Sequence, residues 1–280
     1  MATPWDRAAA GYLDEWVPRF VPYHLDLVRE LALHGGARVL ATSCGPGSEV
    51  LAAARVVGSS GFVRATDKSD EMVRICQDHA RQGGFANVEV AVADARETRG
   101  GPWDAILCAF GLWQMEDRGA LLRAWAEALT ARGKVGILTW GPPDQDGPFE
   151  LLSDCLREIE PALHVPSPRV LAGREPMAQL FDEGGLAMVR HTVVRHTLAF
   201  TSAERFVAAV KESCAWRPLW ERMGEERFGK VAARFFDRIG GPDGPLSFDS
   251  PATIAIGALP GAEIELENRP SLRVPKASAS

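Results

Sequence analysis

The 280-residue chain has an apolar share of 46%, a charged share of 24% and a net charge of -6 at neutral pH. This length suits one large α/β domain, or a domain with a cap, and it allows a substantial buried core. The charges are mixed in sign without a Lys/Arg run, which excludes the basic face that a nucleic-acid partner requires. No apolar run has the length of a membrane helix, so we expect no membrane partner.

The cellular context follows from the first residues and from the cysteines. The opening stretch MATPWDRAAAGYLDEW carries acids where a secretory signal has a basic and then an apolar region, so we expect a cytoplasmic protein. The cysteines are widely spaced and form no CxxC pair, which predicts reduced, mostly buried thiols and no metal site. They are Cys44, Cys76, Cys108, Cys155 and Cys214.

The first part of the chain predicts a helical segment, residues 1–35, followed by an α/β domain. YHLDLVRELALHGG has apolar residues at helical intervals and a suitable helix end at Gly35 and Gly36. Strand and helix patterns then alternate in the order ARVLAT, GSEVLAAARVVG, GFVRAT, SDEMVRICQDHARQGG, VEVAVA, DAILCAF, RGALLRAWAEALTARG and KVGILTW. This alternation predicts a Rossmann-like, doubly wound sheet with mostly parallel strands.

The alternation breaks after Trp140 and later resumes. FELLSDCLREIEPAL and PMAQLFDEGG predict helices, AMVRHTVVRHTLAF predicts a strand, and residues 202–239 are typical of two amphipathic helices separated near Pro218. ATIAIGAL completes a seven-stranded sheet with an antiparallel last strand, and residues 263–280 form a polar tail. We therefore expect a domain over residues 36–262, with helical cap insertions at about 142–174 and 201–247 that cover the pocket.

Three strand ends carry residues that suit a nucleotide-like ligand. In VLATSCGPGSEV, Gly45 and Gly47 allow a ligand to approach the backbone near a helix N-terminus. Asp67 follows the next strand, 20 residues beyond Gly47, where an acid accepts hydrogen bonds from ribose hydroxyls. Val50 occupies the third-glycine position of a dinucleotide fingerprint, which argues against a nicotinamide cofactor. In VAVADARE, the Asp94 carboxylate and an adjacent backbone N–H suit the edge of adenine.

The ordered series VLATSCGPGSE, RATDKSDEMV, VAVADA and WDAILCAFGLWQMEDRGALLRAWAEALTARGKVGILTWG resembles a known family. It is similar to the small-molecule class I S-adenosylmethionine-dependent methyltransferases of the ubiquinone and menaquinone biosynthesis type, over roughly residues 36–141. The resemblance implies S-adenosyl-L-methionine as cofactor and S-adenosyl-L-homocysteine as product. The cofactor contacts it implies are Ser43, Cys44, Gly45 and Gly47 for the methionine part, Asp67 for the ribose, Lys68, Met72, Asp94 and Ala95 for the adenine, Cys108, Ala109 and Phe110 near the sulfonium, and Tyr12 or Tyr23 over the cofactor.

Two residues of the first motif depart from the family pattern. Ala41 stands where the family usually has an acid, and Ser43 stands where it usually has a glycine. The missing acid forfeits a charge-assisted hydrogen bond, of order 1.5 to 3 kcal/mol, which corresponds to roughly tenfold to a hundredfold in affinity. If the loop still serves methyl transfer, Ala41→Asp is expected to tighten cofactor binding.

Several residues also have simpler interpretations. Asp67 could cap the helix that follows it, and Asp94 could be a turn residue. His191 and His196 fall on opposite faces of one strand, which argues against shared metal ligation. His24 and His164 are weak candidates for a catalytic base. Trp113, Trp140, Trp216 and Trp220 suit an apolar substrate wall or ordinary packing.

These observations favour a methyltransferase that acts on an O, N or C atom of a small, largely apolar metabolite, of a natural-product or quinone-like kind. Because the first motif is altered, a second hypothesis keeps the fold and replaces methyl transfer by a cyclisation, elimination or decarboxylation, with the cofactor structural or absent. A third is a non-catalytic partner protein with a degraded pocket. We expect a monomer or a homodimer with a small-molecule substrate.

Overall fold

The computed structural model describes residues 3–163, 169–264 and 266, so the candidate base His164 lies outside the described residues. The contacts divide the chain into two compact units, which are described separately. The sheet unit consists of Phe20–Gly141, Pro168–Val194 and Ala252–Ser280, and the helical unit consists of Met1–Arg19, Pro142–Ser167 and Arg195–Pro251. Each unit is therefore assembled from segments that are distant in the sequence.

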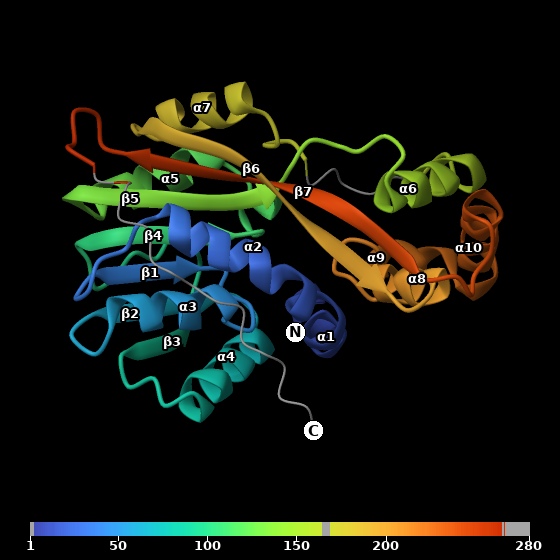
Figure 1. Ribbon diagram of the computed structural model, residues 1–280, viewed down its shortest axis with the longest axis horizontal. Helices are drawn as coiled ribbons and strands as arrows, with labels where there is room; N and C mark the ends of the chain where they lie inside the picture. The colour runs from blue at the N-terminus through green and yellow to red at the C-terminus, as the bar shows by residue number, and fades with distance from the viewer. Residues whose placement is uncertain (1–2, 164–168, 265, 267–280) are drawn as a thin grey trace. The chain divides into compact units, whose positions relative to one another are not determined.

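The seven-stranded sheet has the order β3-β2-β1-β4-β5-β7-β6, as Figure 1 shows. Its strands are β1 (Arg38–Thr42), β2 (Phe62–Asp67), β3 (Val88–Val92), β4 (Trp103–Ala109), β5 (Leu129–Trp140), β6 (Ala187–Phe200) and β7 (Leu246–Ala258). Strands β3, β2, β1, β4 and β5 are parallel to their neighbours, and β7 is antiparallel to β5. The predicted Rossmann-like sheet, mostly parallel with an antiparallel last strand, is confirmed.

The strand order reverses between β1 and β4, which positions the ligand crevice. After β1 the chain adds β2 and β3 on one side and then returns to add β4 on the other side of β1. The register places Thr42 of β1 beside Cys108 of β4 at the carboxyl ends of both strands. In open α/β sheets, the crevice beyond the carboxyl ends at such a reversal is the usual ligand site.

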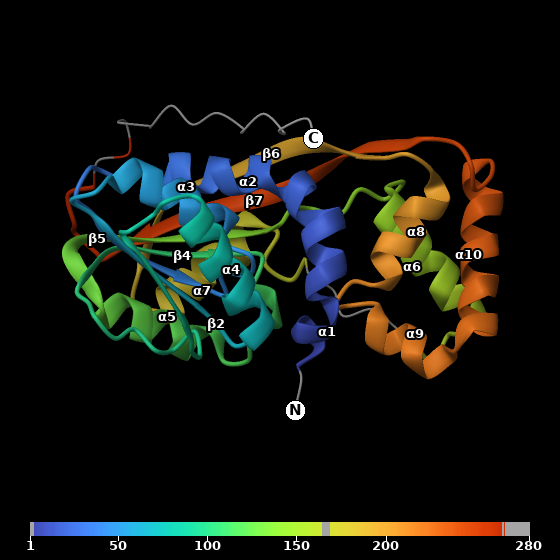
Figure 2. The same cartoon turned by 90° about the horizontal axis from the view of Figure 1, so that it is seen from below.

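Helices cover both faces of the sheet. Figure 2 shows α2 (Val17–Glu30) and α3 (Ser48–Val57) on one side and α5 (Arg118–Glu127) and α7 (Arg174–Glu183) on the other, while α4 (Asp70–Gln82) packs on β2 and β3. The core beneath α5 and α7 contains the fully buried Trp103, Ile106, Trp125 and Phe181. Large apolar side chains from both layers therefore stabilise the side of the sheet that faces α5 and α7.

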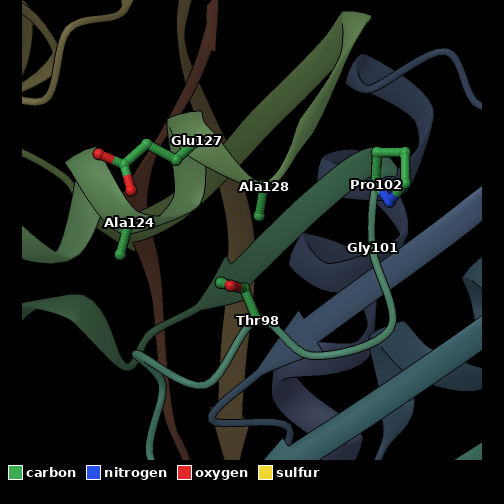
Figure 3. A pocket seen from close by; sticks show the side chains of 6 residues that line it. All are labelled: Thr98, Gly101, Pro102, Ala124, Glu127 and Ala128. Atoms are coloured by element: carbon green, nitrogen blue, oxygen red, sulfur yellow. The ribbon is translucent and has the colours of Figure 1, made fainter.

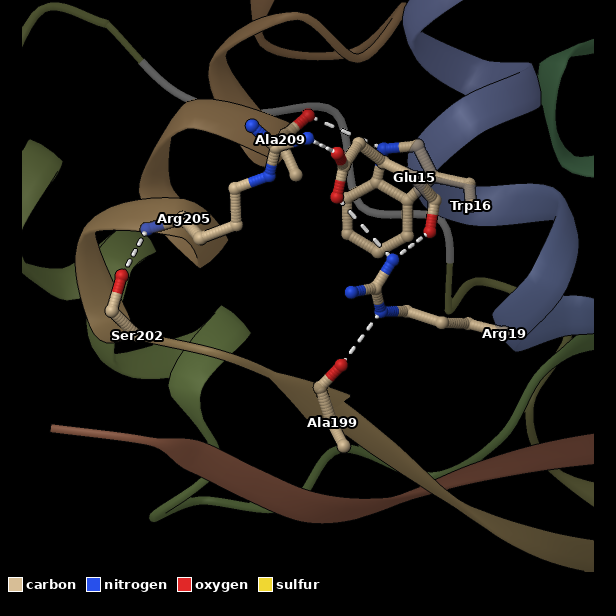
Figure 4. Close-up of polar contacts among 7 residues, drawn as sticks. All are labelled: Glu15, Trp16, Arg19, Ala199, Ser202, Arg205 and Ala209. Atoms are coloured by element: carbon tan, nitrogen blue, oxygen red, sulfur yellow. Dashed lines mark hydrogen bonds and ion pairs between the residues drawn. The ribbon is translucent and has the colours of Figure 1, made fainter. Parts of the chain in front are cut away.

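The helical unit contains α1 (Pro4–Gly11), a π-helical turn (Tyr12–Trp16), α6 (Pro148–Ile159), α8 (Ala203–Lys211), α9 (Arg217–Met223) and α10 (Glu225–Ile239). Figure 4 shows how its first residues attach: Trp16 Nε1 donates to Ala209 O at 3.2 Å, and Arg19 Nε donates to Ala199 O at 2.9 Å. The Glu15 carboxylate pairs with Arg205. These bonds join α8 and β6 to residues 15–19 within this unit.

Several expected boundaries are wrong, including the end of the helix RGALLRAWAEALTARG, because α5 ends at Glu127 and β5 already begins at Leu129. Helix α2 ends at Glu30 instead of near Gly35, because the chain turns at Leu31 and Ala32, where Ala32 has a φ of 45°. Residues 202–239 form three helices instead of two. Gly224, with a φ of 76°, ends the short helix α9 and separates it from α10. Strand β7 begins at Leu246, several residues before ATIAIGAL. Its first four residues are half-buried or exposed, so they lack the continuous apolar run on which the prediction was based.

The thiols behave as predicted in the part of the chain that the structure describes. All five cysteines are free, and all but Cys214 are buried. Among the described residues, no group of His, Cys, Asp and Glu side chains could hold a metal ion. No helix within those residues combines the length and the apolarity that crossing a membrane requires.

Candidate functional site

The loop after β1 is held by backbone hydrogen bonds in a conformation that needs several positive φ angles. Ser43, Gly45 and Gly47 have φ values of 52°, 48° and 91°. The Cys44 N–H donates to Thr66 O of β2 at 2.9 Å, and the Gly47 N–H donates back to Cys44 O at 2.9 Å. The loop therefore turns tightly into α3, whose first N–H groups have no partner within the helix and suit an acceptor group of a ligand.

Asp67, at the end of β2, links this loop to the next one. One carboxylate oxygen accepts from the Gly45 N–H at 2.9 Å, and the other accepts from the Ser69 N–H at 2.9 Å. The interpretation of Asp67 as a helix cap is wrong, because Ser69 is the N-cap of α4 and its hydroxyl accepts from the Met72 N–H at 3.1 Å. A carboxylate has about four acceptor sites, more than these two amides use, so it can also accept from a ligand.

Asp94, after β3, is engaged by two groups. Lys68 Nζ lies 2.7 Å from one carboxylate oxygen, and the other accepts from the Arg96 N–H at 2.9 Å. The hydrogen bond from Lys68 and then that from the Arg96 amide lower the pKa of Asp94 below its ordinary value. The turn role of Asp94 is thus confirmed, and Lys68 and Asp94 lie together as the adenine hypothesis requires. Ala95, which follows Asp94, and Met72, four residues after Lys68, are both buried.

The loop after β4 packs directly on the loop after β1. A Cβ atom on Gly111 would lie 2.7 Å from Ser43 Cβ and 3.1 Å from Cys108 Sγ, so only glycine fits there. Phe110 has a φ of 54°, and its N–H donates to Leu138 O of β5 at 2.7 Å. Cys108, Ala109 and Phe110 are buried at this junction. The sequence analysis missed Gly111, because its role depends on a side chain that is distant in the sequence.

An aromatic cluster surrounds Phe110. Its ring centroid lies 5.1 Å from those of Phe20 and Trp140 and 6.0 Å from that of Tyr23. Three predicted site residues, Tyr23, Phe110 and Trp140, are therefore brought together. Phe20 was missed, although its spacing of three residues from Tyr23 places both on one face of α2.

The other predicted aromatic residues lie elsewhere in the chain. Trp113 belongs to the sheet unit, in a 3-10 turn at Leu112–Gln114, and its carbonyl accepts from Arg118 at 2.8 Å. The helical unit contains Tyr12, whose ring packs edge-on against Trp5, together with Trp216 and Trp220. The Lys211 ammonium lies 4.2 Å from the Trp220 ring centroid. The substrate wall formed by all four tryptophans stays a prediction.

His24 and Glu49 form a buried polar pair in the sheet unit. His24 Nδ1 lies 3.7 Å from Glu49 Oε2, and the two residues are 5% and 2% exposed. Burial lowers the pKa of His24 to about 4 and raises that of Glu49 to about 8. Although the distance falls within ion-pair range, the cost of burying charge therefore leaves both groups neutral at pH 7. Glu49 is an acid among the apolar residues of α3, a signal that the sequence already carries.

The positive φ of Ser43 predicts how substitutions there change stability. A non-glycine residue at positive φ costs about 1–2 kcal/mol, while glycine costs about 0.5–1 kcal/mol more chain entropy, so Ser43→Gly is expected to stabilise the fold slightly. Ser43→Val should destabilise it by about 2 kcal/mol, since a β-branched residue is least tolerated at positive φ. Urea unfolding measures both. Ser48→Gly, in the first turn of α3, is the control and should lower stability; an equal loss with Ser43→Gly would contradict strain at Ser43.

A pocket lies at the amino ends of the strands, away from the motif loops. Its volume is about 470 Å³, and Figure 3 shows the residues that line it: Thr98, Gly101, Pro102, Ala124, Glu127 and Ala128. Pro102 directly precedes β4 and Ala128 directly precedes β5, so this pocket is at the amino ends of these strands. Glu127 is its single ionisable residue, which gives it no set of converging polar groups.

Comparison with known proteins decides between ligand classes for the strand-end site. Residues 39–133, which include the loops after β1, β2, β3 and β4, match the model of a methyltransferase domain. Over these residues the chain is a methyltransferase domain, as its resemblance to class I S-adenosylmethionine-dependent methyltransferases implied. The family resemblance of the four sequence motifs is confirmed, and S-adenosylmethionine is the cofactor of this type of domain.

Similar proteins are known at the levels of sequence and of fold. The demethylmenaquinone methyltransferase of Bacillus subtilis is 25% identical over 181 residues, covering 59% of this chain and 77% of that protein. The crystal structure of YcgJ from Bacillus subtilis has a TM-score of 0.58 at 19% identity and covers 86% of this chain and 100% of that one. The [4+2]-cyclase SpnF has a TM-score of 0.57 at 18% identity, covering 88% and 84%. Both structures share the fold of the methyltransferase domain.

Proposed function

We propose that this chain transfers the sulfonium methyl group of S-adenosylmethionine to an O, N or C atom of a small, largely apolar metabolite. The observation that carries the proposal is the convergence of four motif loops at the strand-order reversal, where Asp67 holds the Gly45 amide at 2.9 Å. The match of residues 39–133 to a methyltransferase domain supports the same reaction.

The residues present fit this cofactor. Asp67 would accept from the ribose hydroxyls, and Lys68, Met72, Asp94 and Ala95 would border the adenine. Ser43, Cys44, Gly45 and Gly47 would hold the methionine part, which Cys108, Ala109 and Phe110 would approach from β4. When bound, the cofactor supplies an electrophilic methyl carbon. The chain's own contribution would be to position the acceptor in line with that carbon and to exclude water, a contribution that accelerates transfer without a covalent enzyme intermediate.

The acceptor class follows from the apolar and aromatic character of the site. Phe20, Tyr23, Phe110 and Trp140 pack together beside the loop after β4, and these aromatic surroundings suit an aromatic or quinone-like molecule. The similar Bacillus subtilis protein is named for methylating demethylmenaquinone, which favours a quinol-type acceptor here as well. The roles of the cap insertions and of Trp113, Trp216 and Trp220 in choosing the acceptor stay predictions.

A product assay tests this function. Purified protein is incubated with S-adenosylmethionine and a panel of naphthoquinols, phenols and small aromatic amines, and products are analysed by mass spectrometry. We expect at least one product heavier by one methylene unit, together with S-adenosylhomocysteine. An isomerised or dehydrated product would favour the non-methylating alternative instead, and absence of S-adenosylmethionine binding by calorimetry at millimolar ligand would exclude the proposal. The likeness to SpnF is one of fold and does not favour cyclisation.

A further inference from the structure

The site lacks the acid that usually ends the first strand. Ala41 is fully buried at this position in β1. Its neighbour Leu40 belongs to the core beneath α5 and α7, and side chains alternate along a strand, so Ala41 faces the side covered by α2 and α3. Those two helices carry His24 and Glu49, and a buried carboxyl group is therefore present on the side from which the acid is missing.

Glu49 belongs to the first turn of α3, two residues after Gly47 of the loop that leaves β1, and its side chain is buried. It interacts electrostatically with Asp67 at the end of β2, with Cys44 in the loop after β1 and with Cys108 near the end of β4. From α2 it is faced by His24, whose Nδ1 is buried 3.7 Å from Glu49 Oε2 and has no hydrogen-bond partner among the residues that the structure describes. Among these groups none is a cation at neutral pH, because burial lowers the pKa of His24, and carboxyl and thiol groups are either neutral or anionic.

A buried acid without a cation is unfavourable for the free protein. Burial raises the pKa of Glu49 to about 8, so the folded protein holds a proton there that the unfolded chain releases above its ordinary pKa of 4.5. The contribution of Glu49 to stability is complete below pH 4.5 and is lost as the pH rises toward 8. Ionisable groups with strongly shifted pKa values are concentrated at functional sites.

We infer that Glu49 supplies, from α3, the negative charge that Ala41 does not provide, and that its carboxylate binds the cationic methionyl end of S-adenosylmethionine. This assignment rests on the proposed function. The bound cofactor gives the Glu49 carboxylate the cationic partner that it lacks in the free protein, and this favours the ionised carboxylate. The proton held by Glu49 in the free protein is therefore released to solvent when the cofactor binds. Glu49 is thus a cofactor-binding residue supplied from outside the usual motif position.

Three ligands and one conservative variant test the assignment by calorimetry. S-adenosylmethionine carries an ammonium and a sulfonium, S-adenosylhomocysteine carries the ammonium alone, and methylthioadenosine carries neither. We expect Glu49→Gln to weaken S-adenosylmethionine binding by roughly tenfold to a hundredfold, the range for loss of a charge-assisted hydrogen bond, and to leave methylthioadenosine binding unchanged. An equal loss with S-adenosylhomocysteine assigns the contact to the ammonium, and a smaller loss assigns it to the sulfonium.

The pH dependence gives a second readout. Between pH 6.0 and 7.5 the free Glu49 must lose its proton to bind a cation, so wild-type affinity for S-adenosylmethionine should rise by nearly tenfold per pH unit, while the Glu49→Gln profile stays flat. The exposed Glu127, at the other end of the sheet unit, provides the control: Glu127→Gln should keep the wild-type affinity and slope. Without ligand, Glu49→Gln should melt at a higher temperature than wild type at pH 8 and gain less at pH 5, which also shows that it folds.

The outcomes separate this inference from the proposed function. If wild type binds none of the three ligands, the proposed function fails. If wild type binds S-adenosylmethionine but Glu49→Gln binds it equally well, or loses methylthioadenosine to the same extent, the charge assignment fails while the function stands.

Ala41→Asp then tests whether Glu49 takes the place of the acid that usually stands at position 41. If Glu49 replaces the usual acid, Ala41→Asp should improve S-adenosylmethionine affinity severalfold or more in the Glu49→Gln background and little in wild type. Equal improvement in both backgrounds would mean that the two carboxylates act independently. The inference that Glu49 takes the place of the usual acid would then be overturned. If Glu49 has this role, Ala41→Asp is expected to tighten S-adenosylmethionine binding mainly in the Glu49→Gln variant, which lacks the Glu49 charge.

Discussion

Asp67→Asn is expected to weaken S-adenosylmethionine binding by at least about 100-fold. The proposed ribose contacts are two hydrogen bonds to a charged acceptor, each contributing about 1.5–3 kcal/mol. The same carboxylate holds the Gly45 and Ser69 amides at 2.9 Å, so one oxygen replaced by an NH2 group would face an N–H donor. The variant should therefore lose ligand contacts and loosen the loop after β1 together. Calorimetry at constant pH measures the loss.

A neighbouring acid gives the matched control for this experiment. Asp70, the first residue of α4, is exposed and has no proposed ligand contact. Asp70→Asn should bind S-adenosylmethionine within about twofold of wild type, since surface substitutions away from a site change free energies by less than about 0.5 kcal/mol. Comparable losses in both variants would remove the ribose role from Asp67.

Gly47→Ala is expected to destabilise the protein by about 2–5 kcal/mol. The φ of 91° at Gly47 is costly for any residue with a Cβ atom, by about 1–2 kcal/mol. The added Cβ would also lie 2.5 Å from Cys76 Sγ, and Cys76 is fully buried in α4, so overpacking adds about 1–3 kcal/mol. Urea unfolding followed by circular dichroism measures the change from the midpoint and slope.

Two further variants separate backbone strain from steric contact at Gly47. At Gly45, where φ is 48° and an added Cβ atom would have no neighbour within 4 Å, Gly45→Ala should show the strain alone. Cys76→Ala removes the clashing sulfur, so adding it to Gly47→Ala should recover part of the lost stability. If Gly47→Ala costs no more than Gly45→Ala, the close approach of α4 to this loop is not what restricts position 47.

Local patterns in the sequence determined the elements and the chemistry of the motif loops. Strand and helix periodicities depend on near neighbours, so the alternation from β1 to β5 could be predicted without the tertiary structure. Gly45, Gly47 and Asp67 were also predictable, because a turn requires particular residue types at particular spacings. The helix ends at Glu30 and Met223 were not, since both depend on backbone angles that the apolar periodicity does not encode.

Tertiary structure decided which distant residues meet. Glu49 and His24 come from different helices, and Phe20, Phe110 and Trp140 come from α2, the loop after β4 and the end of β5. The close fit of Gly111 against Ser43 joins segments about 70 residues apart in the chain. The sequence by itself determined a parallel sheet with a nucleotide-type loop, because those features are set by local geometry. Only the tertiary packing of α2 and α3 decided that Glu49 is buried beside His24, because burial and proximity depend on the whole fold.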